Sequence, residues 1–200
     1  ATGIGGAIGI IRVSGPDTFA VIDSLFTPAA RKDILSAGGY TVHFGSFEKD
    51  EDFIDEVLVT LFRSPASYTG EDAAEISHHA SPFIQRRIME LIIKQGAKPA
   101  MPGEFTMRAF MNGRIDLSQA EAVADLIAAD SEAAHRLAAT QLRGGFSEGI
   151  EKLRKELLTF TSLIELELEV SEEDVQFADR FAMTETVIKI KDTVDRLAAP

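Results

Sequence analysis

The chain has 200 residues, of which 45% are hydrophobic and 26% charged, and its formal net charge is −12. This length and hydrophobic content support a buried core, and the absence of cysteine excludes disulfides, thiolate metal sites and a thiol nucleophile. Residues 116–200 carry 9 basic and 18 acidic residues, against 11 and 14 in residues 1–115. Nucleic-acid binders usually carry a basic stripe for the phosphates, so this charge argues against tight RNA binding by the chain alone.

The sequence shows no sign of a membrane or export segment. No apolar run approaches the roughly 18 residues that span a bilayer, and the start lacks the charged-then-apolar order of a signal peptide. We therefore expect a cytoplasmic protein that contacts no membrane. Ala1 is not an initiator methionine and Pro200 follows an unfinished helical pattern, so we expect a fragment of a longer protein.

The first part of the chain mixes strand and helix patterns. An apolar, β-branched run over residues 7–13 predicts a buried strand, and residues 17–25 predict a helix. Strands are also expected over residues 40–47, 57–62 and 73–78, and helices over 82–95 and 105–110. Together these elements predict an α+β fold class for the first part of the chain.

The second part is helical in pattern almost throughout, which predicts an all-helical segment over residues 118–200. Ser118 and Glu121 have the spacing of a capping box and predict a helix start. Gly144 and Gly145 predict a bend or a close contact between helices, because glycine is unfavourable inside a helix. Residues 164–170 alternate with period two, but their neighbours favour a helix end. A last helix over residues 184–199 has no obvious partner in the chain.

Several kinds of catalytic or metal site are not supported. The Gly-rich residues 3–9 are not a phosphate-binding loop, because the chain contains no Gly-x-x-x-x-Gly-Lys-Ser/Thr sequence. His78 and His79 are adjacent on a predicted strand and should point to opposite faces, so we predict no metal site. The only Gly-x-Ser-x-Gly sequence, at residues 145–149, lies in the helical stretch and not in a strand-to-helix elbow, so a nucleophilic triad is not supported and we predict no catalytic residue in this chain.

Four segments carry a longer pattern: GIIRVSG at residues 9–15, SYTGED at 67–72, PGEFTMRAFMNGRIDLSQAEAVADLI at 102–127 and VSEEDV at 170–175. In these segments the chain resembles the MnmE (TrmE) family of tRNA modification GTPases, and the resemblance spans nearly all of its length. It implies a tetrahydrofolate-binding and dimerisation domain over residues 1–117, followed by the first part of a helical domain over residues 118–200.

The resemblance also implies three folate-binding residues, namely Arg12, Glu75 and Arg114. Their chemistry suits a folate, because a carboxylate accepts hydrogen bonds from the pterin amino group and ring N–H, while guanidinium groups suit its carbonyl oxygens and glutamyl tail. Two structural alternatives stay open: Arg12 and Glu75 form a partly buried ion pair between neighbouring strands, and Arg114 is simply solvated. The family's His-Gly is His79-Ala80 here, and alanine would be unfavourable if that glycine needs a positive φ.

For the full-length protein, the resemblance implies binding of 5-formyltetrahydrofolate or a related tetrahydrofolate and a homodimer formed through the folate domain. It further implies joint action with the flavin-dependent protein MnmG (GidA) on C5 of the wobble uridine, U34, of tRNA. GTP, Mg²⁺ and K⁺ would belong to a GTPase domain absent from this chain. Two alternatives remain: a stand-alone folate-dependent one-carbon transferase, which needs a catalytic carboxylate in its pocket, and a non-catalytic dimerisation scaffold, which binds no folate.

Overall fold

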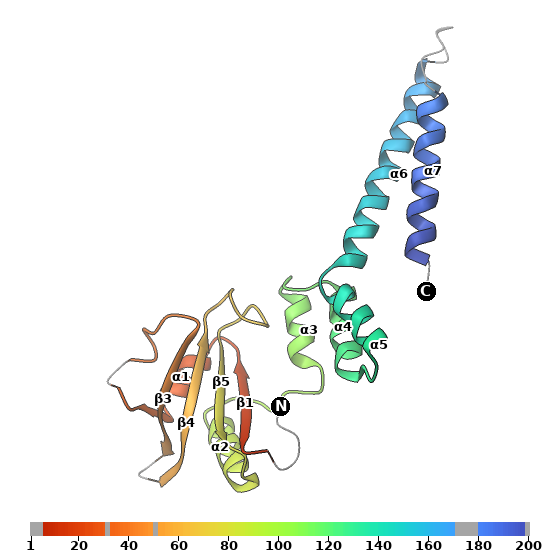
Figure 1. Cartoon of the computed structure of the whole chain (residues 1–200). Helices are drawn as coiled ribbons and strands as arrows, with labels where there is room; N and C mark the ends of the chain where they lie inside the picture. The colour runs from red at the N-terminus through yellow and green to blue at the C-terminus, as the bar shows by residue number, and fades with distance from the viewer. Residues whose placement is uncertain (1–5, 31–32, 50–51, 171–179, 199–200) are drawn as a thin grey trace. The chain divides into compact units, whose positions relative to one another are not determined.

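The computed structural model describes residues 6–30, 33–49, 52–170 and 180–198, and the chain divides into two compact units, Ala1–Ile115 and Asp116–Pro200 (Figure 1). The first unit contains a five-stranded sheet in the order β1-β5-β4-β3-β2, with every neighbouring pair antiparallel. Its strands are β1 (Ile8–Ser14), β2 (Phe26–Pro28), β3 (Thr41–Lys49), β4 (Asp52–Phe62) and β5 (Ala73–His79). The four predicted strands are present, and β2 is a strand that the sequence did not reveal. The prediction that the first strand is buried is wrong, because β1 lies at the edge of the sheet and only Ile11 in it is buried.

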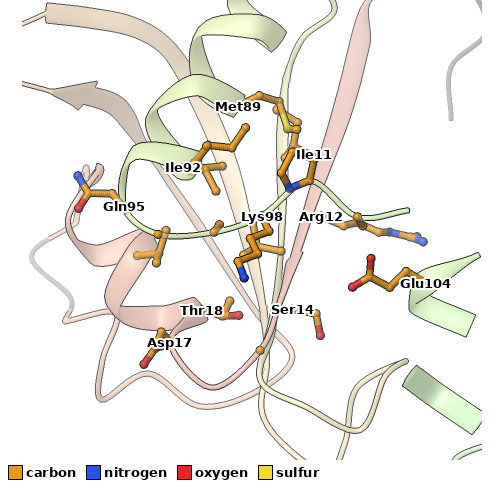
Figure 2. Close-up of a pocket in the computed structure, with 18 of the residues that line it drawn as sticks. Ile11, Arg12, Ser14, Asp17, Thr18, Met89, Ile92, Gln95, Lys98 and Glu104 are labelled. Atoms are coloured by element: carbon orange, nitrogen blue, oxygen red, sulfur yellow. The ribbon is translucent and has the colours of Figure 1, made fainter. Parts of the chain in front are cut away.

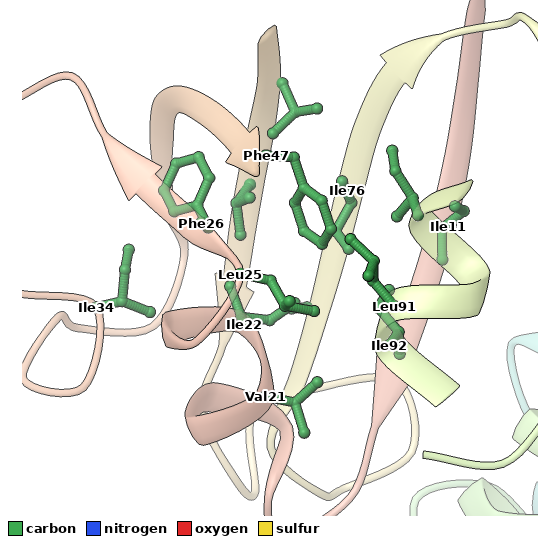
Figure 3. Close-up of a cluster of buried hydrophobic side chains, with 14 of the residues drawn as sticks. Ile11, Val21, Ile22, Leu25, Phe26, Ile34, Phe47, Ile76, Leu91 and Ile92 are labelled. Carbon is green, nitrogen blue, oxygen red and sulfur yellow. The ribbon is translucent and has the colours of Figure 1, made fainter. Parts of the chain in front are cut away.

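The helices described in the first unit are α1 (Thr18–Asp23), α2 (Pro82–Lys94) and α3 (Glu104–Met111). Helix α2 begins with a proline, whose fixed φ suits a first turn, and it ends just before Gly96, whose φ is +102°. Helices α1 and α2 both contact the sheet, and their buried side chains join those of one sheet face in a single core (Figure 3). The core includes Ile11, Ile22, Phe47, Ile76 and Leu91. Each such side chain contributes about 1.5–3 kcal/mol when fully buried.

Several side chains on the opposite face of the sheet are exposed, and we call this face the open sheet face. Side chains alternate between the two faces of a strand, so register places the members of each row next to one another. One row consists of Arg12, Glu75, Thr60 and Val42, and the next of Ile10, Ser77, Leu58 and Phe44. Four apolar members of these rows, Ile10, Val42, Phe44 and Leu58, are 45–60% exposed.

The short strand β2 depends on a glycine in its neighbour. Gly45 pairs with Pro28, and a Cβ atom at Gly45 would overlap the Thr27 carbonyl oxygen and the Phe26 ring. A side chain at this position would therefore push β2 away from β3.

The described residues of the second unit form the helices α4 (Leu117–Ala128), α5 (Glu132–Leu142), α6 (Gly145–Val170) and α7 (Arg180–Ala198). Within it, α4 packs on α5 and α6 runs beside α7 (Figure 1). The last predicted helix therefore does have a partner in the chain, contrary to the sequence-based expectation. The bend at Gly144 is confirmed, since this residue has φ +87° and separates α5 from α6. Residues 164–170 are helical and end α6.

The capping box predicted at Ser118 and Glu121 is wrong by two residues. The N-cap of α4 is Asp116, whose carboxylate accepts the Gln119 N–H, while the Gln119 side chain accepts the Asp116 N–H. Ser118 lies inside the helix. In the parts of the chain that the structure describes, no helix is long and apolar enough to cross a bilayer. The predicted fold class, an α+β domain followed by helices, is confirmed.

Candidate functional site

Two of the three predicted folate residues meet on the open sheet face. Arg12 of β1 lies directly opposite Glu75 of β5, and its Nε donates to the Glu75 Oε1 at 2.7 Å. The side chains remain 58% and 30% exposed, respectively. The pair is therefore the cross-strand ion pair considered above, but it is open to solvent rather than deeply buried. An exposed pair of this kind contributes at most about 1 kcal/mol to stability.

Arg114 lies in the same unit, just after α3. Gly113, with φ +68°, ends the helix, and the Arg114 N–H donates to the Ala109 carbonyl at 2.8 Å. The aliphatic stem of Arg114 lies against Gly70, where an added Cβ would approach its Cγ to 3.1 Å. Its guanidinium has no hydrogen-bond or ion-pair partner among the described residues. In the described part of the chain, Arg12 is thus paired with Glu75, whereas the guanidinium of Arg114 is exposed and unpaired.

A polar network holds the loop between β4 and β5 against the end of β1. The Ser14 hydroxyl lies 2.6 Å from the Thr69 hydroxyl and donates to the Glu71 carboxylate at 2.9 Å. Arg108 of α3 donates to the same Glu71 carboxylate at 3.1 Å and to the Ser14 carbonyl at 3.2 Å. Because β5 follows this loop, the network fixes the end of the sheet that carries Glu75.

The same loop anchors the turn that carries Arg114. The Asn112 amide donates to the Thr69 carbonyl at 2.7 Å, and the Tyr68 hydroxyl lies 2.9 Å from that of Thr106. These contacts tie both ends of α3 to the loop. In the sequence, SYTGED and NGR stand out only as separate segments of the family pattern, and nothing in it predicts that they meet in space.

A pocket of about 460 Å³ lies beside Arg12 (Figure 2). Its walls come from β1, the start of α1, the last turns of α2, the segment after α2 and the start of α3. Neither Glu75 nor Arg114 is among the lining residues. The apolar part of the lining includes Ile11, Val21, Met89, Ile92 and Phe105, and the charged part consists of Arg12, Asp17, Lys98, Glu104 and Arg108.

Glu104 is held as an anion at the edge of this pocket. Its carboxylate accepts the Met101 N–H at 2.8 Å and pairs with Arg108 at 2.9 Å. The Met101 hydrogen bond, followed by the charge of Arg108, lowers the pKa of Glu104 from its usual range. Arg108 is thereby shared between Glu104 and Glu71.

The two adjacent histidines point to opposite faces, as predicted. His78 is buried and His79 is exposed. The buried Asp55 accepts two hydrogen bonds from His79, one from its backbone N–H at 2.8 Å and one from its Nδ1 at 2.7 Å. Ala80, where the resemblance implies a glycine, does not have a positive φ. Alanine therefore causes no backbone strain at this position.

Comparisons with known proteins cover both units. Residues 1–114 match the sequence model of a family described as "GTP-binding protein TrmE N-terminus", and residues 117–200 match that of the "MnmE helical domain". The chain is 56% identical over 199 residues to a "tRNA modification GTPase MnmE" of Bacteroides fragilis and 55% identical over 198 residues to that of Bacteroides thetaiotaomicron. A protein of the same description from Cytophaga hutchinsonii is 52% identical over 192 residues.

These matches take in nearly all of this chain but less than half of each relative. They cover 99%, 98% and 96% of the chain, respectively, and 43%, 43% and 41% of the three relatives.

Proposed function

The chain belongs to the MnmE (TrmE) family, and from this premise we propose that its first unit binds a tetrahydrofolate, such as 5-formyltetrahydrofolate, through Arg12, Glu75 and Arg114. The longer protein would act as a tRNA modification GTPase. The chain spans about 43% of its relatives, so that GTP, Mg²⁺ and K⁺ are assigned to a part outside it.

The observation that carries the proposal is the solvent-open pair of Arg12 and Glu75. A charge pair on an exposed sheet face contributes little to stability, so stability alone does not account for these two side chains. A pterin offers an amino group and a ring N–H, for which the Glu75 carboxylate provides two acceptor oxygens. Arg12 orients that carboxylate, and it retains further N–H groups for carbonyl oxygens of the ligand.

Arg114 would supply the second cation of the site. Its guanidinium is unpaired in the described part of the chain, while its stem is fixed against Gly70. A side chain held in place at its base but free at its charged end suits recognition of a carbonyl or carboxylate. Both arginines therefore support the orientation of one bound folate.

The experiment is a calorimetric titration of 5-formyltetrahydrofolate into the chain and into its Glu75→Gln variant. We expect saturable binding near one per chain for the wild type and at least about a ten-fold weaker Kd for Glu75→Gln, because the lost carboxylate leaves the ligand's N–H groups with weaker acceptors. Glu90→Gln on α2, which removes a charge at a distance from the site, is the matched control. Equal folate affinity in the wild type and Glu75→Gln would overturn the site assignment.

The first unit would also dimerise through the open sheet face. Exposed apolar side chains flank the Arg12–Glu75 row on this face. The other face of the sheet is already covered by α1 and α2. Burial of such a surface between two copies favours association, since apolar area leaves water. The dimer would place the folate residues at or near the interface.

In the full-length protein, this segment would present the folate and hold the dimer together. The reaction would be the modification of C5 of U34 in tRNA, performed with MnmG as partner. The second unit is acidic and therefore a poor surface for tRNA, so the tRNA contacts would lie largely outside residues 116–200.

A further inference from the structure

We propose that the pocket beside Arg12 binds the anionic oligoglutamate tail of a folate, with Lys98 as the side chain that recognises the tail carboxylates. The proposal rests on the folate function proposed above and adds to it a preference for the length of the glutamyl tail. A folate with several γ-linked glutamyl units would bind more tightly than the monoglutamate.

The first argument is continuity with the candidate site. Arg12 contacts Glu75 on the open sheet face and also lines the pocket, so a ligand held by Arg12 has this volume within reach. Its 460 Å³ falls within the range of small-molecule sites. The apolar lining from Ile92, Met89 and Phe105 suits the aminobenzoyl ring that precedes the tail.

The second argument is the distribution of charge in the pocket. Arg12 is paired with Glu75, and Arg108 is shared between Glu71 and Glu104. Lys98, by contrast, has no hydrogen-bond or ion-pair partner within the described residues. Figure 2 shows its side chain near the middle of the labelled lining residues. A free ammonium group over a partly apolar pocket is suited to a mobile carboxylate of a ligand.

The third argument is the outer edge of β1 at Arg12, since β1 is the first strand in the order of the sheet. The Ala7 carbonyl accepts from the Ala80 N–H, and the Gly15 N–H donates to the Asp72 carbonyl, so the backbone groups of these two odd-numbered residues face the β5 side. Because this direction alternates along an antiparallel strand, the N–H and C=O groups of the even-numbered residues of β1 point away from β5. Consistent with this, the outward carbonyl of Ser14 accepts from Arg108. The outward peptide groups of Arg12 are placed to pair with the amides of a γ-glutamyl chain, as an exposed strand edge pairs with an extended peptide.

One acidic side chain opposes the tail. Asp17 lines the pocket, and its carboxylate has no partner among the described residues and makes no side-chain cap for α1. It would repel the tail carboxylates and thereby limit its affinity. Asp17→Asn should therefore strengthen tail binding without disturbing α1.

The test compares 5-formyltetrahydrofolate with one and with three glutamyl units by calorimetric titration into the full 200-residue chain. Four proteins are used: wild type, Lys98→Ala, Asp17→Asn and the control Lys94→Ala. Lys94 is an exposed lysine on α2 that does not line the pocket. Tyrosine emission and circular dichroism confirm that each variant is folded.

We expect the wild type to bind the triglutamate about five-fold more tightly than the monoglutamate, which corresponds to one charge-assisted contact. The preference for the triglutamate should disappear in Lys98→Ala and persist in Lys94→Ala. It should increase in Asp17→Asn, and high salt should reduce it. Equal binding of both ligands by the wild type, or an undiminished preference in Lys98→Ala, would overturn the tail assignment alone. If neither ligand binds the folded wild type, the proposed folate function fails together with it.

Discussion

At the scale of single residues, Asp55 illustrates how a buried charge is tolerated in the first unit. Its side chain on β4 accepts both hydrogen bonds from His79, the last residue of β5. Removal of the carboxylate would leave the His79 backbone N–H without its acceptor. A partly buried donor without a partner costs free energy, because water does not fully replace the lost bond.

We predict that Asp55→Ala lowers the free energy of unfolding of the first unit by about 1–3 kcal/mol. Asp52→Ala, on the same strand, should cost less than about 1 kcal/mol, since Asp52 forms a largely exposed ion pair with Arg87. The measurement is urea unfolding followed by tyrosine emission, which reports on the first unit because Tyr40 and Tyr68 are the only tyrosines and no tryptophan is present. A cost no greater for Asp55→Ala than for Asp52→Ala would contradict the prediction.

The sequence predicts single residues well only where one physical rule decides. The opposite orientations of His78 and His79 follow from strand geometry alone. The contact between Arg12 and Glu75 required a guess about which strands are neighbours, and it appeared only as an alternative. The cap of α4 was misplaced because Asp116 with Gln119 and Ser118 with Glu121 both fit the rule, and only tertiary contacts choose between them.

At the scale of elements, Asp116 joins the start of α4 to the start of α6. Its carboxylate accepts the Gln119 N–H at 2.8 Å and the Ser147 hydroxyl at 2.6 Å. The Ser147 hydrogen bond first, and the Gln119 bond second, lower the pKa of Asp116 from its usual range. Because the pKa is lower in the folded state, this contribution to stability is complete above the usual aspartate pKa of about 3.9 and is lost as the pH falls below it.

We predict that Asp116→Ala destabilises the second unit by about 1 kcal/mol at pH 7, as expected for loss of a helix cap. The difference between wild type and variant should shrink as the pH is lowered from 5 to 3. Urea unfolding followed by circular dichroism at 222 nm measures this, with tyrosine emission as a check that the first unit is unaffected. Asp125→Asn, at an exposed position of α4, serves as control and should leave the stability unchanged at both pH values. An Asp116→Ala difference that does not change with pH would argue against the carboxylate's role.

Most elements of the first unit were predicted within two residues of their bounds, but β4 begins five residues before its predicted start and β2 was missed. Strand β2 has three residues and ends in proline, so it offers no alternation to detect. The division of the first helical stretch into α4 and α5 was also missed, because Ala129 and Asp130 contain neither glycine nor proline. The partner of α7 was not visible because packing between helices is set by facing side chains rather than by the period of one helix.

At the scale of the whole molecule, the contrast between a covered and an open sheet face bears on assembly. We predict that the chain is a dimer in solution and that Phe44→Glu, at the centre of the open sheet face, shifts its mass toward the monomer. A charge in a buried apolar interface carries a large desolvation cost. Light scattering after size exclusion gives the mass, and Phe83→Glu, at an exposed site on α2, is the matched control. A dimer that survives Phe44→Glu but not Phe83→Glu would place the interface on the helical side.

The site as a whole was accessible from the sequence only through family resemblance. The residue types alone indicated a carboxylate and two cations, but their three positions lie 63 and 39 residues apart in sequence, at residues 12, 75 and 114. The pocket beside Arg12 was not foreseen, because its walls come from five separate segments. A volume of this kind depends on how elements pack, which periodicity does not encode.

The contact between Arg108 and the Ser14 carbonyl has a further consequence for the behaviour of the sheet during storage and expression. An outer strand with unsatisfied peptide groups is a template for strands of other molecules, and proteins commonly block such templates with cationic side chains. Arg108 occupies one outward acceptor of β1 and places a charge beside it. We therefore expect Arg108, which also holds the loop before Glu75 in place, to hinder edge-to-edge aggregation.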